Sequence, residues 1–228
     1  MLIIGHRGAR GLAPENTLAS MEAGIDAGAI ILEFDVHITK DNIPVIIHDD
    51  HVVYGNKKHF VRKLTYSQLR SLHTDAKAIP TLAEILNKYW KKVYLNIEVK
   101  GKGSGKAVAE TLQKRCKSSE DWDHCLISSF RPKELQAVRN RSAHASLGLI
   151  HKRNPLRFLA HYRNLDLSAV GWHRLYINPV AIETAKKLDL FTYVYTVNRP
   201  DGANRLAKQG IDAVVTDFPD KIYKSTML

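Results

Sequence analysis

The chain has 228 residues and a formal net charge of +11, with 44% hydrophobic and 25% charged residues. These proportions are typical of a globular domain, and no apolar run approaches the ~18 residues of a membrane span, so we expect no stable membrane insertion. The positive charge favours an anionic partner, but aromatic residues are not interleaved with the basic ones as in a base-stacking surface, so we expect a small molecule and no nucleic acid.

Short apolar runs rich in β-branched residues alternate with longer amphipathic segments along the whole chain. The predicted strands are 2–5, 30–36, 44–48, 93–99, 125–129, 146–150, 168–172, 191–197 and 212–216. The predicted helices are 17–27 behind a capping-type Asn16, 83–90, 107–116, 132–140, 155–162, 179–188 and 200–208. This alternation is typical of parallel strands joined by helical crossovers. With 44–48 as an extra strand after the second one, it predicts an α/β fold of the (β/α)8 TIM barrel type rather than an open doubly wound sheet.

No compositional break divides the chain, so we expect a single domain over residues 1–228, with a short insertion at about 50–78. The N-terminus leads directly into the first predicted strand and has no signal-peptide pattern. Two cysteines without a secretory signal indicate reduced thiols, which favours a cytoplasmic protein. The sequence makes no prediction of the oligomeric state.

The first predicted strand ends in His6-Arg7-Gly8, and Pro14-Glu15-Asn16-Thr17 opens the following helix. An imidazole can transfer protons near neutral pH, and a guanidinium can bind phosphate oxygens through two hydrogen bonds. Because barrel enzymes place their reacting groups at the carboxyl ends of strands, His6 and Arg7 are candidate catalytic and substrate-binding residues.

The second predicted strand carries Glu33 and Asp35, whose side chains project to the same side because strand residues alternate between faces. Glu98 on the next main strand is expected to stand beside them, and Lys100 follows at the rim, where it can neutralise a phosphate oxygen. Clustered carboxylates repel unless a cation lies between them, and oxygen ligands select a hard ion. The sequence therefore predicts one divalent cation, Mg²⁺ or Ca²⁺, held by Glu33, Asp35 and Glu98.

A second histidine, His48, ends the apolar run 44–48, so two strand-end imidazoles are expected at one barrel mouth. His6 and His48 suit an acid-base pair in which one group removes a proton and the other donates one, although the sequence leaves the two roles unassigned. Tyr195 lies near the end of a late strand and can line the substrate side of the mouth.

Together these motifs resemble the glycerophosphodiester phosphodiesterase family over about residues 2–220. The matching segments are His6-Arg7-Gly8, Pro14-Glu15-Asn16-Thr17, Glu33-x-Asp35, His48-Asp49, Ile79-Pro80-Thr81-Leu82, Asn96-Ile97-Glu98-Val99-Lys100, Ser128-Ser129-Phe130, Thr196-Val197-Asn198 and Thr216-Asp217-x-Pro219. The resemblance implies a metal-dependent phosphodiesterase that cleaves glycerophosphodiesters into sn-glycerol 3-phosphate and an alcohol. It implies that His6 and His48 are the acid-base pair, that Arg7 and Lys100 contact phosphate, and that Tyr195 stands where the family commonly has Trp.

Two alternatives remain open from the sequence. A lysophospholipase D-like or sphingomyelinase D-like phosphodiesterase would need an apolar rim for an acyl chain, to which Leu156, Phe158 and Leu159 are candidates. A non-catalytic phosphate or nucleic-acid binder would explain the basic charge, but retention of both histidines and all three acids argues against it.

Overall fold

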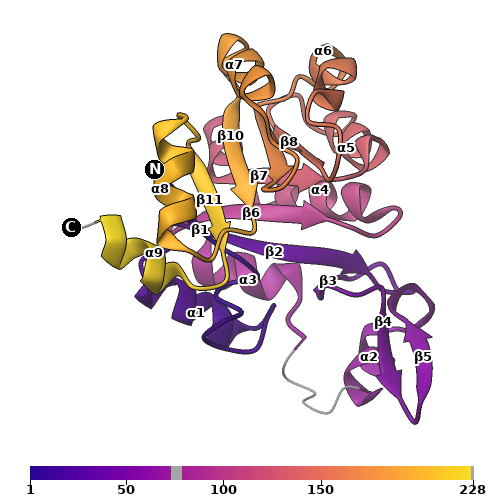
Figure 1. Ribbon diagram of the computed structural model, residues 1–228. Helices are drawn as coiled ribbons and strands as arrows, with labels where there is room; N and C mark the ends of the chain where they lie inside the picture. The colour runs from indigo at the N-terminus through magenta and orange to yellow at the C-terminus, as the bar shows by residue number, and fades with distance from the viewer. Residues whose placement is uncertain (73–78, 227–228) are drawn as a thin grey trace.

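The computed structural model describes residues 1–72 and 79–226, and its centre is a closed barrel of parallel strands (Figure 1). The barrel strands are β1 (Leu2–Gly5), β2 (Ile31–Ile38), β6 (Tyr94–Val99), β7 (Cys125–Ser129), β8 (Ser146–His151), β9 (Ala169–His173), β10 (Phe191–Tyr195) and β11 (Ala213–Thr216). Each pairs with the next in parallel, and β1 pairs with both β2 and β11, which closes the sheet. The predicted (β/α)8 barrel is confirmed.

Helices cover the outside of the barrel (Figure 1). They are α1 (Leu18–Asp26), α3 (Leu82–Tyr89), α4 (Ser104–Arg115), α5 (Pro132–Arg139), α6 (Tyr162–Leu165), α7 (Pro179–Lys187), α8 (Pro200–Lys208) and α9 (Pro219–Thr226). A proline opens α5, α7 and α8, where its missing N–H costs nothing. Within residues 1–72 and 79–226, the structure contains no helix with both the length and the apolar character needed to cross a bilayer.

Two apolar layers hold the barrel together. The larger lies between the strands and the helices and includes the buried side chains of Phe34, Trp172 and Leu86. A smaller cluster contains Ile4 and Tyr193 with other strand residues alone. Side chains alternate along each strand, so one set points toward the helices and the other toward the barrel axis. The polar groups of the site lie at the open end of this axis.

The segment after β2 builds a small extension at the edge of the barrel (Figure 1). Strand β3 (Pro44–Ile46) runs antiparallel to β2, and a hairpin of β4 (His51–Tyr54) and β5 (Lys57–Phe60) follows. A 3₁₀ turn (Val61–Lys63) and α2 (Tyr66–Leu72) complete the described part. The extension packs around its own small core, which consists of Val45, Val52, Val61, Leu69 and Ile79. The predicted extra strand is confirmed, although it ends at Ile46 rather than His48.

The hairpin and α2 fall within the predicted insertion at 50–78, of which residues 73–78 lie outside the described residues. The hairpin turn is Gly55-Asn56, and both residues adopt positive φ, at 55° and 58°. Such a turn matches the twist of antiparallel strands. The Gly-Asn pair was thus the local signal for a hairpin where the sequence indicated only a loop.

Two local predictions need correction, and one helix was missed. The helix expected at 155–162 is instead a 3₁₀ turn (Arg157–Ala160) followed by the single-turn α6, an arrangement in which the Phe158 side chain is completely buried. Thr17, not Asn16, caps α1, because its hydroxyl accepts a hydrogen bond from the Ser20 N–H at 3.1 Å. Helix α9 after the last strand was not predicted.

Candidate active site

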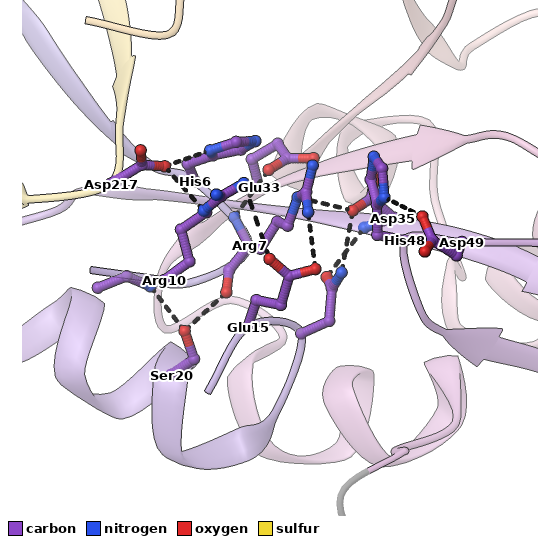
Figure 2. A network of polar contacts seen from close by, with 12 residues as sticks. His6, Arg7, Arg10, Glu15, Ser20, Glu33, Asp35, His48, Asp49 and Asp217 are labelled. Carbon is purple, nitrogen blue, oxygen red and sulfur yellow. Dashed lines mark hydrogen bonds and ion pairs between the residues drawn. The ribbon is translucent and has the colours of Figure 1, made fainter. Parts of the chain in front are cut away.

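The turn after β1 is fixed by backbone contacts that only glycine permits. Arg7 and Gly8 both adopt positive φ, at 50° and 83°, and a Cβ on Gly8 would lie 2.4 Å from the Ser20 carbonyl carbon. The hydroxyl of Ser20 accepts a hydrogen bond from the Ala9 N–H at 2.8 Å and donates one to the Arg7 carbonyl at 2.7 Å. Glycine at position 8 therefore allows the chain to turn tightly, so that Arg7 points toward the acids of β2 (Figure 2).

The three predicted acids lie together at the carboxyl end of neighbouring strands. Glu33 and Asp35 come from β2, and Glu98 on β6 is the register partner of Asp35. One carboxylate oxygen from each lies within 4.8 Å of the others. Glu33 and Asp35 are 4% and 1% exposed, so the cluster is removed from water.

Positive side chains balance part of this acidic cluster. The Lys100 ammonium lies 3.2 Å from Asp35 Oδ1 and 3.5 Å from Glu98 Oε1, and Arg7 Nε lies 3.2 Å from Asp35 Oδ2. Arg7 also donates a hydrogen bond to Glu15 at 2.7 Å, and its backbone N–H donates to Glu33 at 2.8 Å (Figure 2). Burial opposes the charge on Asp35, but Lys100 and Arg7 hold the pKa of this carboxyl below its usual range.

The negative charges of the other two acids, Glu98 and Glu33, are less well balanced by nearby positive groups. Burial, together with the charge of Asp35, raises the pKa of Glu98 to about 7. Burial and the charges of Asp35 and Glu98 raise the pKa of Glu33 well above its usual value. Glu98 Oε1 is buried and accepts no hydrogen bond from the described residues. A divalent cation fits this donor set, because carboxylate oxygens are the ligands of Mg²⁺ and Ca²⁺ and a bound cation favours the ionised forms.

Each histidine is oriented by a carboxylate. His6 Nδ1 lies 2.5 Å from Asp217 Oδ1, and His48 Nδ1 lies 2.7 Å from Asp49 Oδ1 (Figure 2). In each pair the carboxylate can accept a hydrogen bond from Nδ1–H, which leaves Nε2 available to another partner, as for the histidine of a Ser-His-Asp triad. Asp217 in turn accepts a hydrogen bond from Asn198 at 2.7 Å.

A deep pocket of about 290 Å³ brings these groups together. Every predicted site residue lines it, namely His6, Arg7, Glu33, Asp35, His48, Glu98, Lys100 and Tyr195. His48 reaches the pocket differently from the prediction, since it follows the antiparallel β3 in a turn and does not end a strand. Burial, with the charges of Lys100 and Arg7, lowers the pKa of His48, while the nearby Asp35 opposes that shift.

Tyr195 presents its ring rather than its hydroxyl to the pocket. Its hydroxyl donates a hydrogen bond to the His151 carbonyl at 2.8 Å, and its ring meets Phe130 edge to face with centroids 5.9 Å apart. These contacts fix the ring as part of the wall. The chemistry that Tyr195 offers a ligand is therefore apolar contact.

Four residues of the matching motifs belong to the polar network of the site but were not predicted as site residues, namely Asp217, Asp49, Asn198 and Glu15. Asp49 follows His48 directly and was the easiest to recognise as its partner. Asp217 contacts His6 across 211 residues of sequence, and only closure of the barrel between β1 and β11 brings the two together.

Comparison with known proteins agrees with this geometry. A sequence model of the glycerophosphoryl diester phosphodiesterase family matches residues 6–221. A glycerophosphodiester phosphodiesterase from Caldanaerobacter subterraneus is 31% identical, over 97% of this chain and 96% of that protein.

Solved structures give the same result. An Oleispira antarctica phosphodiesterase, solved in complex with the product sn-glycerol-3-phosphate, has a TM-score of 0.85 and 26% identity, over 100% of this chain and 97% of that one. A glycerophosphodiester phosphodiesterase from Thermotoga maritima has a TM-score of 0.82 and 26% identity, over 98% and 97% of the two chains. The chain therefore belongs to the glycerophosphoryl diester phosphodiesterase family.

Proposed function

We propose that this protein hydrolyses glycerophosphodiesters to sn-glycerol 3-phosphate and an alcohol, by acid-base catalysis between His6 and His48. The observation that carries the proposal is the deep pocket itself, in which two carboxylate-oriented imidazoles flank an acidic cluster. The Oleispira antarctica relative with bound sn-glycerol-3-phosphate supports the choice of product.

The proposed chemistry follows from the charge of the substrate. A diester phosphate carries one negative charge, and further charge develops on its oxygens in the transition state, where Arg7 and Lys100 can offset it. One imidazole Nε2 takes the proton of the attacking hydroxyl, from water or from the glycerol 2-hydroxyl, as the new P–O bond forms. The other imidazole protonates the leaving alkoxide as its P–O bond breaks, so the alcohol leaves neutral. Attack by water gives sn-glycerol 3-phosphate directly, whereas attack by the glycerol 2-hydroxyl gives a cyclic phosphate that a water then opens to the same product.

A single divalent cation, Mg²⁺ or Ca²⁺, would be held by Glu33, Asp35 and Glu98. When bound, such an ion supplies Lewis-acid stabilisation of the phosphate oxygens. The residues fit it because Glu98 Oε1 has no hydrogen-bond partner among the described residues, and burial disfavours several uncompensated carboxylates at one place. Lys100 would then be freer to face the phosphate, since the ion would take over part of the charge of Asp35 and Glu98.

The alternative of a phosphodiesterase for acylated substrates has little support in the structure. Of the three candidate rim residues, Phe158 is completely buried and Leu156 packs against the core, so Leu159 alone is substantially exposed, at 46%. This favours a deacylated glycerophosphodiester over a lysophospholipid or sphingomyelin.

The test is a turnover assay that measures choline released from glycerophosphocholine and from lysophosphatidylcholine. We expect turnover of the first and little of the second. His6→Ala and His48→Ala should each lower kcat by about 10²- to 10⁴-fold. His144→Ala, which removes an exposed histidine outside the pocket, is the matched control. Activity of both site variants within a few-fold of wild type would refute the acid-base pair.

A further inference from the structure

A second hollow opens directly beside the deep pocket. It is a groove of about 750 Å³, and six residues line both hollows, namely His48, Glu98, Lys100, Phe130, Ile150 and Lys152. His6 and Arg7 line the deep pocket but not the groove. A phosphate held near Lys100 would therefore direct one of its ester arms into the deep pocket and the other into the groove.

The groove carries positive charge that the protein does not neutralise. Its wall contains Arg131, Lys152, Arg153 and Arg157, all of them exposed. Within the described part of the chain, the three guanidinium groups make no ion pair or side-chain hydrogen bond. The Lys152 ammonium lies 5.4 Å from the centroid of the Phe130 ring.

Each acid that lines the groove already contacts a histidine or a lysine. Asp49 contacts His48 Nδ1 at 2.7 Å, and Asp50 contacts His51 Nδ1 at 2.8 Å. Glu98 belongs to the acidic cluster and lies 3.5 Å from the Lys100 ammonium. The exposed arginines of the groove therefore have no acidic partner among its lining residues and can receive an anionic group.

One buried polar group in the same wall points to a ligand independently of these surface charges. His151 is only 6% exposed, and its Nε2 has no hydrogen-bond partner among the described residues. Burial, together with Arg157 and His161, lowers its pKa to about 4, so the ring is neutral at pH 7 and Nε2 can donate a hydrogen bond. A buried polar atom without a hydrogen-bond partner destabilises the fold, which is a reason to expect that a ligand supplies the missing partner.

We propose that the groove binds the alcohol arm of the diester and selects an alcohol that carries a second phosphate group. This inference rests on the proposed phosphodiesterase function and specifies its substrate class. Arg157 and Arg153 would pair with the second phosphate, since a guanidinium matches phosphate oxygens in geometry, and His151 Nε2 would donate to the same arm. The deep pocket, at about 290 Å³, would hold the smaller glycerol arm.

The test compares two substrates that differ in one group. Glycerophosphoglycerol has an uncharged alcohol arm, and its derivative phosphorylated on the distal glycerol has the same arm with a terminal phosphate. We expect wild-type kcat/KM to be about tenfold or more higher for the phosphorylated substrate at low salt, and the ratio to shrink as salt screens the charges. Arg157→Gln and Arg153→Gln should each lower this ratio about threefold or more.

Two further variants provide a control and a test of the buried histidine. Arg163→Gln removes an exposed positive charge from α6, outside both hollows, and should leave the ratio unchanged. His151→Leu removes the Nε2 donor and should lower the ratio of the two kcat/KM values. If this buried variant does not fold, the exposed variants Arg157→Gln and Arg153→Gln still test the inference. A wild-type ratio near one, with normal turnover of both substrates, would overturn the inference and leave the proposed function standing. Turnover of neither substrate would overturn both.

Discussion

Asp217 and Asp49 orient the two imidazoles, but only one of them is well shielded from water. The Asp217 side chain is 15% exposed and that of Asp49 is 63% exposed. Exposed ion pairs contribute little, whereas a shielded carboxylate fixes both the ring orientation and its tautomer. We predict that Asp217→Asn lowers kcat by about 10²-fold or more and that Asp49→Asn lowers it by less than about tenfold.

Steady-state kinetics with thermal melts would check this prediction. The loss should appear in kcat more than in KM, and both variants should melt close to wild type. Equal effects of the two substitutions, or a loss confined to KM, would show that Asp217 does not act through His6.

The raised pKa of Glu98, about 7, has a defined consequence for stability without metal. The folded protein keeps a proton on Glu98 between the ordinary glutamate pKa of 4.5 and its raised pKa of about 7, a range of pH in which the unfolded chain has lost that proton. Because the folded state then binds more protons, the free energy of unfolding must fall as pH rises through this window. Glu98→Gln removes this titration while keeping a similar shape.

We therefore predict that, in chelator, wild type loses stability relative to Glu98→Gln as pH rises from about 5 to about 8. Urea unfolding of both proteins across this range would measure the difference. Added Mg²⁺ or Ca²⁺ should reduce the wild-type loss, because the ion favours the ionised carboxylate. A difference between the two proteins that stays constant with pH would contradict the assignment.

At the scale of elements, the loop between β6 and α4 is held by a buried acid from α5. Glu134 is 6% exposed, and its carboxylate accepts hydrogen bonds from the N–H groups of Gly103 at 3.0 Å and Gly105 at 2.9 Å. This loop follows Lys100 directly, so the contact links the packing of α4 and α5 to the position of a site residue.

Glu134→Ala should lower the free energy of unfolding by about 2 kcal/mol, because it leaves the buried N–H of Gly105 without an acceptor and removes the hydrogen bond to the more exposed N–H of Gly103. Glu183→Ala on α7 is the matched control, since that glutamate is 69% exposed and its pair with Lys187 lies in solvent, where an ion pair contributes little. Urea unfolding of both variants would test the expectation. Equal losses would show that the Glu134 contacts do not hold the loop.

The elements also show which local patterns the sequence determines. The β2 acids were predictable because the two-residue period of a strand places Glu33 and Asp35 on one side whatever surrounds them. The structure of segment 155–162 was not predictable in the same way. Burial of the Phe158 side chain against Trp172, with ring centroids 6.1 Å apart, prevailed over the local helical pattern. Tertiary packing decides such short segments.

At the scale of the whole molecule, closure of the barrel completes the site. The strand count predicted the barrel and therefore the meeting of Glu33, Asp35 and Glu98 on adjacent strands. The contact between His6 and Asp217 depends on the pairing of β1 with β11, and no local pattern encodes a contact between chain ends. The sequence thus indicated the groups that line the pocket better than the carboxylates that contact the two histidines.

The acidic cluster is expected to bind one divalent ion on which turnover depends. The most direct test is to titrate the exhaustively chelated protein with Mg²⁺ or Ca²⁺ while following heat of binding and turnover of glycerophosphoglycerol in parallel. We predict binding of one ion per chain, recovery of activity in proportion to occupancy, and loss of both signals in Asp35→Asn. Full turnover in the presence of chelator, or an Asp35→Asn protein that binds and turns over like wild type, would contradict the account.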